Sequence, residues 1–371
     1  MAKTNFAALT TEQKTVWARD VWKVAREKSF MTKFMGTSHD SMIHRVTELT
    51  KDERGTRAVV TLVPDLEGDG VTGDYDLEGN EEEIKAYDTV IQIDQLRNAN
   101  RTTGRMADQK SIVNFRQTSR DVLGYWLADR YDQQAFLTLS GVTYDKKNNG
   151  GDRPTKSAGQ NLTDLEYASD VAAPTANRHL RVSGSDIVLG TESSLTSSDA
   201  FGYRHVVQAL AFAKDNYIRG VKGKGGSETF HFFLTPQGMA KLKLDADFIA
   251  NARNAGVRGD SNSLFAGGET FMIDGAMIHS YRHVFNTKGA SAGNKFGAAG
   301  DVDGQRILMC GAQALAFADI GAPYWNEDRF DYENQVGISV GKMCGFLKPK
   351  FNSTVTSSVE DFGVAVIDAA I

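Results

Sequence analysis

The side chains with the clearest chemical potential lie between residues 65 and 83, in the stretch DLEGDGVTGDYDLEGNEEE. Asp65, Glu67, Asp69, Gly70 and Asp76 approach the calcium-loop pattern D-x-[DN]-x-[DN]-G-x5-E, in which carboxylates surround the ion. Two departures weaken the match: Glu67 is longer than the usual third ligand, and Asp76 replaces the Glu that closes the cage. The pattern therefore predicts at most a partial calcium site.

The charge of this stretch is a stronger signal than its spacing. Nine carboxylates occur without a single Lys or Arg, and they repel one another unless water, cations or a basic partner screens them. Two interpretations stay open, a solvated acidic loop and a docking arm that meets a basic surface on another subunit. The nine acids are Asp65, Glu67, Asp69, Asp74, Asp76, Glu78, Glu81, Glu82 and Glu83.

Other candidate sites carry weaker patterns. His279 and His283 are four residues apart, which suits zinc, but their context MIDGAMIHSYRHVF favours a strand, and Cys310 is the one further ligand considered. The glycine-rich run GVKGKGGS at 220–227 fails the phosphate-loop spacing and precedes a strand, so a mobile basic turn is expected. We therefore expect structural histidines, no enzyme, and no catalytic, cofactor-binding or metal-binding residue.

Composition sets further limits. A chain of 371 residues exceeds the size at which one core stops growing, so two or more subdomains are expected. Two cysteines, Cys310 and Cys344, cannot form a disulfide framework and favour reduced thiols in a cytoplasm. No signal peptide or membrane-spanning run is evident. The net charge of −5 argues against a dedicated DNA binder, which would carry surplus Lys and Arg.

The elements expected around the acidic stretch weaken the calcium interpretation. The β-rich runs at 56–63 and 84–93 predict an extended hairpin, whereas an EF-hand loop lies between helices. Residues 106–139 contain no proline and predict one helix of about 34 residues and about 50 Å. An amphipathic helix is also expected at 11–35, ending at Gly36.

The remaining chain predicts mixed α and β structure. A polar excursion is expected from 140 to about 177, with little regular structure. Strands are expected at 185–191, 228–235, 270–285 and 305–310, and a buried strand in the last segment, TSSVEDFGVAVIDAAI. Helices are expected from Ser198, after Pro236 and at 245–257.

Several segments in this order resemble the tailed-bacteriophage major capsid proteins. They are LVPDLEGDGVTGDYDLEGNEEE, IQIDQLRNANRTTGRMADQ, the long helix ending in FLTLSG, FFLTPQGMAKLK, DADFIANARNAGVRG and FLKPKFNSTVTSSVEDFGVAVIDAA. More narrowly, the chain is similar to the major capsid branch first seen in a lytic coliphage with a large virion polymerase. The resemblance covers nearly the whole chain except the excursion near 141–180.

The resemblance implies the α+β capsid fold of the Hong Kong 97 type, with five parts. These would be an N-terminal arm at 1–55, an extended loop at 56–104, a peripheral domain at 105–199 with the spine helix within 106–139, an axial domain at 200–325, and a return to the peripheral domain at 326–371. In such shells the extended loop lies over a neighbouring subunit. No built-in scaffold segment and no covalent cross-link is expected here.

The function implied is a major capsid protein that self-assembles, through hexamers and pentamers, into an icosahedral shell around double-stranded phage DNA. The resemblance implies a scaffolding protein and a portal as partners, leaves room for a decoration protein, and implies DNA held inside without sequence-specific binding. It implies no membrane partner and no cofactor. The protein would belong to the virion capsid and assemble in the cytoplasm of the bacterial host.

For the subunit contact we expect the acidic loop to meet basic residues of a neighbour. A calcium-dependent binding module at 65–76 is the alternative, and an enzyme using His279, His283 and Cys310 is a third. The expected contact residues are Asp69, Asp74, Asp76, Glu78, Glu81, Glu82 and Glu83 on the loop, Arg97, Arg101 and Arg105 at its base, and Lys110, Arg116 and Arg120 on the spine helix.

Overall fold

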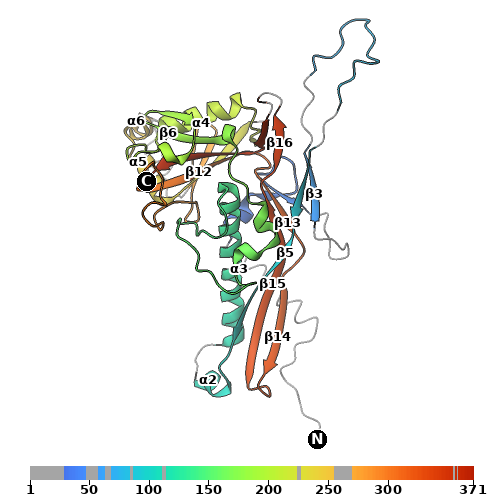
Figure 1. The fold of residues 1–371 in the computed structure, drawn as a ribbon, viewed down its shortest axis with the longest axis vertical. Helices are drawn as coiled ribbons and strands as arrows, with labels where there is room; N and C mark the ends of the chain where they lie inside the picture. The colour runs from blue at the N-terminus through green and yellow to red at the C-terminus, as the bar shows by residue number, and fades with distance from the viewer. Residues whose placement is uncertain are drawn as a thin grey trace.

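The chain forms an elongated molecule with a long hairpin at one end (Figure 1). The structure is a computed structural model, and it describes residues 29–46, 57–62, 68–83, 87–110, 114–223, 227–254, 270–353, 356 and 358–371. Two large sheets and one long helix make up the body. The mixed α and β class expected from the sequence is confirmed.

The hairpin consists of β3 (Arg57–Leu62) and β4 (Tyr87–Gln92), paired antiparallel from Arg57 opposite Gln92 to Leu62 opposite Tyr87. Both strands lie where the β-branched runs predicted them. Their far ends carry the hairpin tip, residues 68–83, which has turns but no strand or helix. After β4 the chain enters β5 (Asp94–Arg101), which leaves the hairpin and joins the body.

The long helix is shorter than expected. Asn114 is extended (φ −70°, ψ 105°), and its side chain accepts a hydrogen bond from the backbone N–H of Gln117, so it caps the start of α3 (Phe115–Ser140). The prediction of one helix over 106–139 is therefore wrong, because a separate helix, α2 (Arg105–Lys110), precedes this cap. The 26 residues of α3 span about 39 Å and end at Gly141, whose φ of 67° suits a residue without Cβ.

The α3 helix lies against the first sheet. Tyr131 of α3 packs edge-on against Phe317 and Phe346 with ring centroids 5.9 and 6.1 Å apart, in a core that also holds Leu127 and Val340. The strands of this sheet are, in order, β1 (Met35–Gly36), β2 (Ile43–Val46), β13 (Leu315–Asp319), β15 (Gln335–Leu347) and β14 (Tyr324–Phe330), with β5 also paired to β15.

The second sheet has eight strands and its own core. Helices α4 (Tyr203–Asp215), α5 (Pro236–Leu244) and α6 (Ala246–Asn254) supply apolar side chains to that core. The strand order is β10 (Thr270–Ile273), β11 (Ala276–Ser280), β9 (Glu228–Leu234), β12 (Gly304–Cys310), β18 (Val364–Ala370), β6 (His179–Ser183) and β7 (Asp186–Leu189), with β8 (Val221–Lys222) on β9.

Several predicted elements differ from those observed. Of the helix expected at 11–35, residues 11–28 lie outside the described residues, Met31–Phe34 form a 3-10 turn, η1, and Met35–Gly36 form β1. The single strand expected in the last segment is instead two strands, β17 (Ser358–Asp361) and β18, with a bend at Phe362 and Gly363 between them. β17 pairs with β16 (Lys350–Ser353). The polar excursion holds three short 3-10 turns, η2 (Leu162–Asp164), η3 (Glu166–Asp170) and η4 (Ala176–Arg178).

Candidate interaction surface

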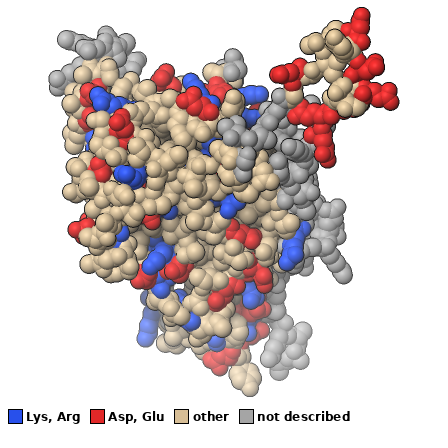
Figure 2. Space-filling model, turned by 45° about the horizontal axis from the view of Figure 1, so that its top comes forward, with Lys and Arg blue, Asp and Glu red and all other residues tan. Residues whose placement is uncertain are grey.

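The hairpin tip is an exposed and strongly charged part of the described chain. Its seven carboxylates are all exposed, and Figure 2 shows them as a red group that projects from the body with no blue beside it. Local hydrogen bonds within the tip include one from Gly68 N to the Glu82 carboxylate at 2.6 Å and one from Gly79 N to the Glu81 carboxylate at 2.8 Å. The seven are Asp69, Asp74, Asp76, Glu78, Glu81, Glu82 and Glu83.

Two apolar side chains stand among these acids. Tyr75 is 80% exposed and Leu77 is 60% exposed, so neither contributes to the core of its own chain. Each leaves apolar area in water whose burial against a partner would be stabilising by about 25 cal/mol per Å2. The tip thus combines negative charge with apolar anchors, as a docking element does.

The structure does not assemble a calcium cage at this tip. Among the described carboxylates of 68–83, no three place ligand atoms within reach of one ion. Asp65 and Glu67 lie outside the described residues. The flanking elements are strands, not the helices of an EF-hand.

The six basic residues expected at the contact fall into two groups. Arg116 and Arg120 are already paired in their own chain, Arg116 with Glu327 and Arg120 with Asp121 at 2.9 Å. The others are exposed, and in the described part of the chain no carboxylate forms an ion pair with them. These four are Arg97 and Arg101 on β5 and Arg105 and Lys110 on α2.

The residues suspected of catalysis do not converge. His279 Nε2 is hydrogen-bonded to His231 Nδ1 at 3.0 Å. His283 lies in the turn after β11, and its Nε2 is hydrogen-bonded to Asp129 Oδ1 at 2.8 Å. The expectation that both histidines share a strand is wrong, because β11 ends at Ser280. Cys310 is buried in β12, and burial raises the pKa of its thiol, which makes a thiolate nucleophile unfavourable.

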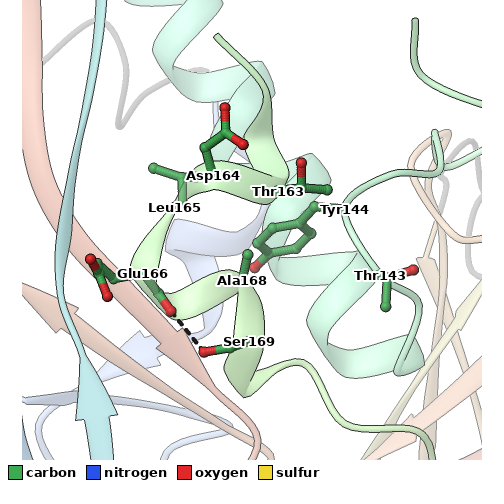
Figure 3. A pocket seen from close by; sticks show the side chains of 8 residues that line it. All are labelled: Thr143, Tyr144, Thr163, Asp164, Leu165, Glu166, Ala168 and Ser169. Carbon is green, nitrogen blue, oxygen red and sulfur yellow. Dashed lines mark hydrogen bonds between the residues drawn. The ribbon is translucent and has the colours of Figure 1, made fainter. Parts of the chain in front are cut away.

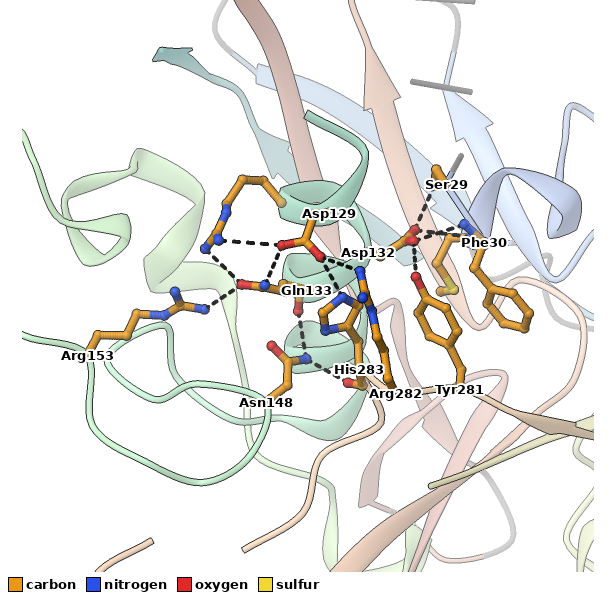
Figure 4. Close-up of polar contacts among 12 residues, drawn as sticks. Ser29, Phe30, Asp129, Asp132, Gln133, Asn148, Arg153, Tyr281, Arg282 and His283 are labelled. Atoms are coloured by element: carbon orange, nitrogen blue, oxygen red, sulfur yellow. Dashed lines mark hydrogen bonds and ion pairs between the residues drawn. The ribbon is translucent and has the colours of Figure 1, made fainter. Parts of the chain in front are cut away.

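An arm clamp, which the sequence did not predict, holds the start of the described chain against α3 (Figure 4). Asp132 accepts hydrogen bonds from Ser29 Oγ at 2.6 Å, from Phe30 N at 2.9 Å, from Met31 N and from the Tyr281 hydroxyl. The Phe30 ring stacks on Tyr281 with centroids 4.2 Å apart. The clamp therefore joins three segments distant in sequence at one carboxylate.

A buried ion cluster joins the second sheet to the end of α3. Arg306 on β12 donates to both oxygens of Asp368 on β18, at 2.8 and 3.0 Å, to Glu192 at 3.1 Å and to Ser140 O at 3.1 Å. His179 Nε2 lies 2.6 Å from Asp368. Burial, the largest single effect, opposes the charge on Asp368, but Arg306 and His179 together outweigh it and the pKa of this carboxyl is lowered.

This cluster explains the one group of potential metal ligands found among the described residues, His179, Glu192 and Asp368. The guanidinium of Arg306 bonds both carboxylates, which makes the group a buried salt-bridge network. The sequence carried a signal for it, since Arg306 in GQRILMC and Asp368 in VAVIDAA are single, opposite charges inside apolar strands.

A cavity of about 410 Å3 opens within the polar excursion (Figure 3). It is lined by hydroxyl, carboxyl and apolar groups, among them Tyr144 and Asp164, and the Ser169 hydroxyl donates to Glu166 O at 2.9 Å within it. Its lining includes no His, Cys, Lys or Arg.

In the described part of the chain, no helix is both long and apolar enough to cross a bilayer.

Comparison with known proteins gives consistent matches. A protein-family model described as phage capsid protein matches residues 5–371. The major capsid protein of Pseudomonas phage KPP25 is 55% identical over 365 residues, 97% of this chain and 96% of the relative. The capsid of Ralstonia phage GP4 superposes with a TM-score of 0.72 at 26% identity, covering 100% of this chain and 95% of that chain.

A more distant likeness supports the fold alone. The cyanophage Pam1 capsid asymmetric unit has a TM-score of 0.71 at 15% identity, covering 100% of this chain and 96% of that chain. The overall fold is therefore similar although most residues differ.

Proposed function

The chain belongs to the phage capsid protein family, and we propose that its copies enclose double-stranded DNA in an icosahedral shell built from hexamers and pentamers. It is a major capsid protein with the tailed-phage capsid fold, as its resemblance to that family implied. Its role is structural: it forms a container through contacts between identical chains. Each contact is weak alone, and the shell is stable because every subunit is held by several neighbours.

The observation that carries the assembly proposal is the hairpin tip. Seven exposed carboxylates and two exposed apolar side chains stand at the tip of the hairpin, which projects from the body of the chain (Figure 2). A neighbouring copy supplies the missing partner. Exposed ion pairs contribute about 0–1 kcal/mol each, so the charges set register and partner choice more than strength.

We propose that the chain is divided into the five parts that the resemblance implies, with the same bounds. The arm at 1–55 and the extended loop at 56–104 reach toward neighbours. The peripheral domain at 105–199, with the return at 326–371, and the axial domain at 200–325 form the wall. The hairpin β3–β4 supports an extended loop within 56–104, whereas the eight-stranded sheet also takes β6, β7 and β18 from outside 200–325.

The remaining partners follow from the same proposal. A scaffolding protein and a portal take part in assembly in the cytoplasm of the bacterial host, and a decoration protein is compatible with the outer surface. DNA is enclosed without sequence-specific contacts. The net charge of −5 supports this, since a strongly basic wall would bind the packaged DNA.

Charge reversal at the hairpin tip tests the assembly proposal. The triple variant Glu81→Lys, Glu82→Lys, Glu83→Lys should fold normally and fail to form shells, since its tip would repel a basic partner surface. Sedimentation velocity and negative-stain microscopy, with the phage's scaffolding protein added where shells require it, report the particles. A matched triple, Asp215→Lys, Glu228→Lys, Asp301→Lys, changes three exposed acids elsewhere and should assemble. Normal particles from the hairpin variant would contradict the proposal.

A further inference from the structure

The first described segment of the chain lies on two histidines of the second sheet. The Phe34 ring stands edge-on to both imidazoles, with its centroid 5.2 Å from that of His231 and 5.1 Å from that of His279. The Phe30 ring is also edge-on to His279, at 6.2 Å. His231 is 8% exposed and His279 is 5% exposed. The two phenylalanines therefore help to shield the histidine pair from water.

Strands β9 and β11 bring the two histidines together. His231 and Phe233 are two residues apart on β9 and so point to the same side, and Phe233 is the register partner of His279 on β11. The two imidazole rings are stacked with centroids 5.2 Å apart, and the second nitrogen of His279, Nδ1, is hydrogen-bonded to Thr270 Oγ1 at 3.1 Å. A neutral pair satisfies the contact between the rings with one N–H and one lone pair.

A proton added to this pair has no acidic group to receive it. In the described part of the chain, no carboxylate forms a hydrogen bond or an ion pair with His231 or His279. Burial lowers the pKa of both imidazoles to about 4. Lys33 of η1 adds a positive charge that also disfavours the protonation of His279. The pair is therefore held neutral as long as this segment covers it.

Other titratable groups face the same segment from the elements around it. Asp132 of α3 bonds the backbone of Phe30 and accepts from the Tyr281 hydroxyl, so its carboxylate is bonded to the arm and not to the histidines (Figure 4). Cys310 of β12 is the register partner of His231, and burial raises the pKa of its thiol, which keeps it neutral. Neither group compensates a charge on the histidine pair through a direct bond.

We propose that the segment Ser29–Phe34 is an acid-sensitive latch, in which proton uptake by His231 and His279 expels Phe30 and Phe34 from the second sheet. Once the segment has left, both imidazoles meet water and bind protons with their ordinary affinity. Proton binding and release of the segment therefore favour each other. The latch lies within a single chain, so the inference goes beyond shell assembly and does not depend on it.

The direction of the pH dependence follows from the two histidines. Each binds a proton more weakly when the segment is docked, so acid favours release in the window between the ordinary pKa of 6.5 and the lowered value of about 4. A single histidine that regains its ordinary pKa raises the ratio of released to docked chains about twentyfold between about pH 7 and about pH 5. We therefore expect an increase of at least about tenfold.

Amide hydrogen exchange of the unassembled full-length chain tests the latch without any substitution. After correction for the slower intrinsic exchange in acid, exchange at residues 30–34 should rise at least about tenfold from about pH 7 to about pH 5. Strand β18, in the centre of the second sheet, should stay protected and serves as the internal reference. Unchanged exchange at 30–34, or an equal rise in both regions, would overturn the proposal.

Histidine variants identify the groups that take up the protons. His231→Phe should give a smaller rise between the two pH values, and His231→Phe with His279→Gln should abolish it. The control His205→Gln removes a histidine of α4 whose pKa burial also lowers, and it should keep the full rise. A general loosening raises exchange at both pH values and leaves their ratio unchanged. A full rise in the double variant would assign the release to another group, such as Asp132, and would overturn the proposal.

A change of charge on the segment itself provides a second test. Lys33→Glu replaces the exposed ammonium that opposes protonation with a carboxylate that favours it. A protonated pair would then be tolerated beneath the segment, so the rise in exchange at 30–34 should shrink and shift to lower pH. The matched control Lys214→Glu changes an exposed lysine of α4 and should leave the rise as it is in the unmodified chain. An equal rise in both variants would contradict the latch.

Discussion

The hairpin tip and the buried ion cluster hold opposite kinds of charge. In the tip, seven carboxylates are gathered and all of them are exposed. In the cluster, Asp368 is fully buried and is bonded by both Arg306 and His179. A buried charge is costly unless it is paired within the chain. Exposed charges of one sign are solvated by water and remain available to a partner of opposite charge. The cluster therefore serves the fold, and in the proposed function the tip serves assembly.

This contrast predicts where stability is lost. Arg306→Met should lower the free energy of unfolding by about 3–5 kcal/mol, because it leaves Asp368 charged and buried without its main partner. Urea denaturation of unassembled protein measures the loss. The matched control is Asp152→Asn, which breaks the exposed Lys146–Asp152 pair and should cost at most about 1 kcal/mol. Similar losses in both variants would remove the distinction between buried and exposed charge.

The arm clamp should show an intermediate effect. Asp132→Asn turns an acceptor of four hydrogen bonds into a group with only one acceptor oxygen, at a cost of about 2–3 kcal/mol. Amide hydrogen exchange should rise at residues 30–36 and stay unchanged at the hairpin tip. Tyr281→Phe, which removes one of the four bonds and keeps the ring, should cost about 1 kcal/mol. Unchanged exchange at 30–36 would show that the arm is held elsewhere.

The histidine pair predicts acid sensitivity of the body. Burial lowers the pKa of His231 and of His279 to about 4. Their ordinary pKa is 6.5, so below that pH the unfolded chain binds more protons than the folded one. The free energy of unfolding should fall as the pH drops from 6.5 toward 4.

Replacing one histidine checks this sign. The melting temperature of His231→Phe should depend less on pH between 6.5 and 4 than that of the unmodified chain. The variant lacks one of the two histidines whose protonation is disfavoured in the folded state. Phe34 and Phe233 already surround this position with aromatic rings, which suits a phenyl group. An identical pH dependence would assign the acid sensitivity to other groups.

The smallest effect on stability is expected at the hairpin tip. Glu81→Lys, Glu82→Lys, Glu83→Lys should change the free energy of unfolding by less than about 0.5 kcal/mol, since the three acids are exposed. Denaturation of unassembled protein measures this. A loss of several kcal/mol would mean that the tip belongs to the folding unit, and the comparison with the cluster would fail.

The sequence predicted those elements whose pattern is local. The β-branched runs marked β3 and β4, and the acidic stretch marked an exposed tip. The break at Asn114 was missed because the apolar spacing continues across it, and only the cap to Gln117 reveals the start of α3. The arm clamp could not be foreseen, since Ser29, Asp132 and Tyr281 meet only through the packing of three distant segments. The sequence also could not show which arginines are paired within the folded chain, as Arg116 is with Glu327.

One measurement tests the division between folding charge and assembly charge most directly. Sedimentation velocity and thermal melting would be recorded in parallel on the unmodified chain, on the Glu81–Glu83 lysine variant and on Arg306→Met. The account predicts that the lysine variant melts like the unmodified chain and sediments without shells, whereas Arg306→Met melts at a clearly lower temperature. Full shells from a normally folded lysine variant would contradict it.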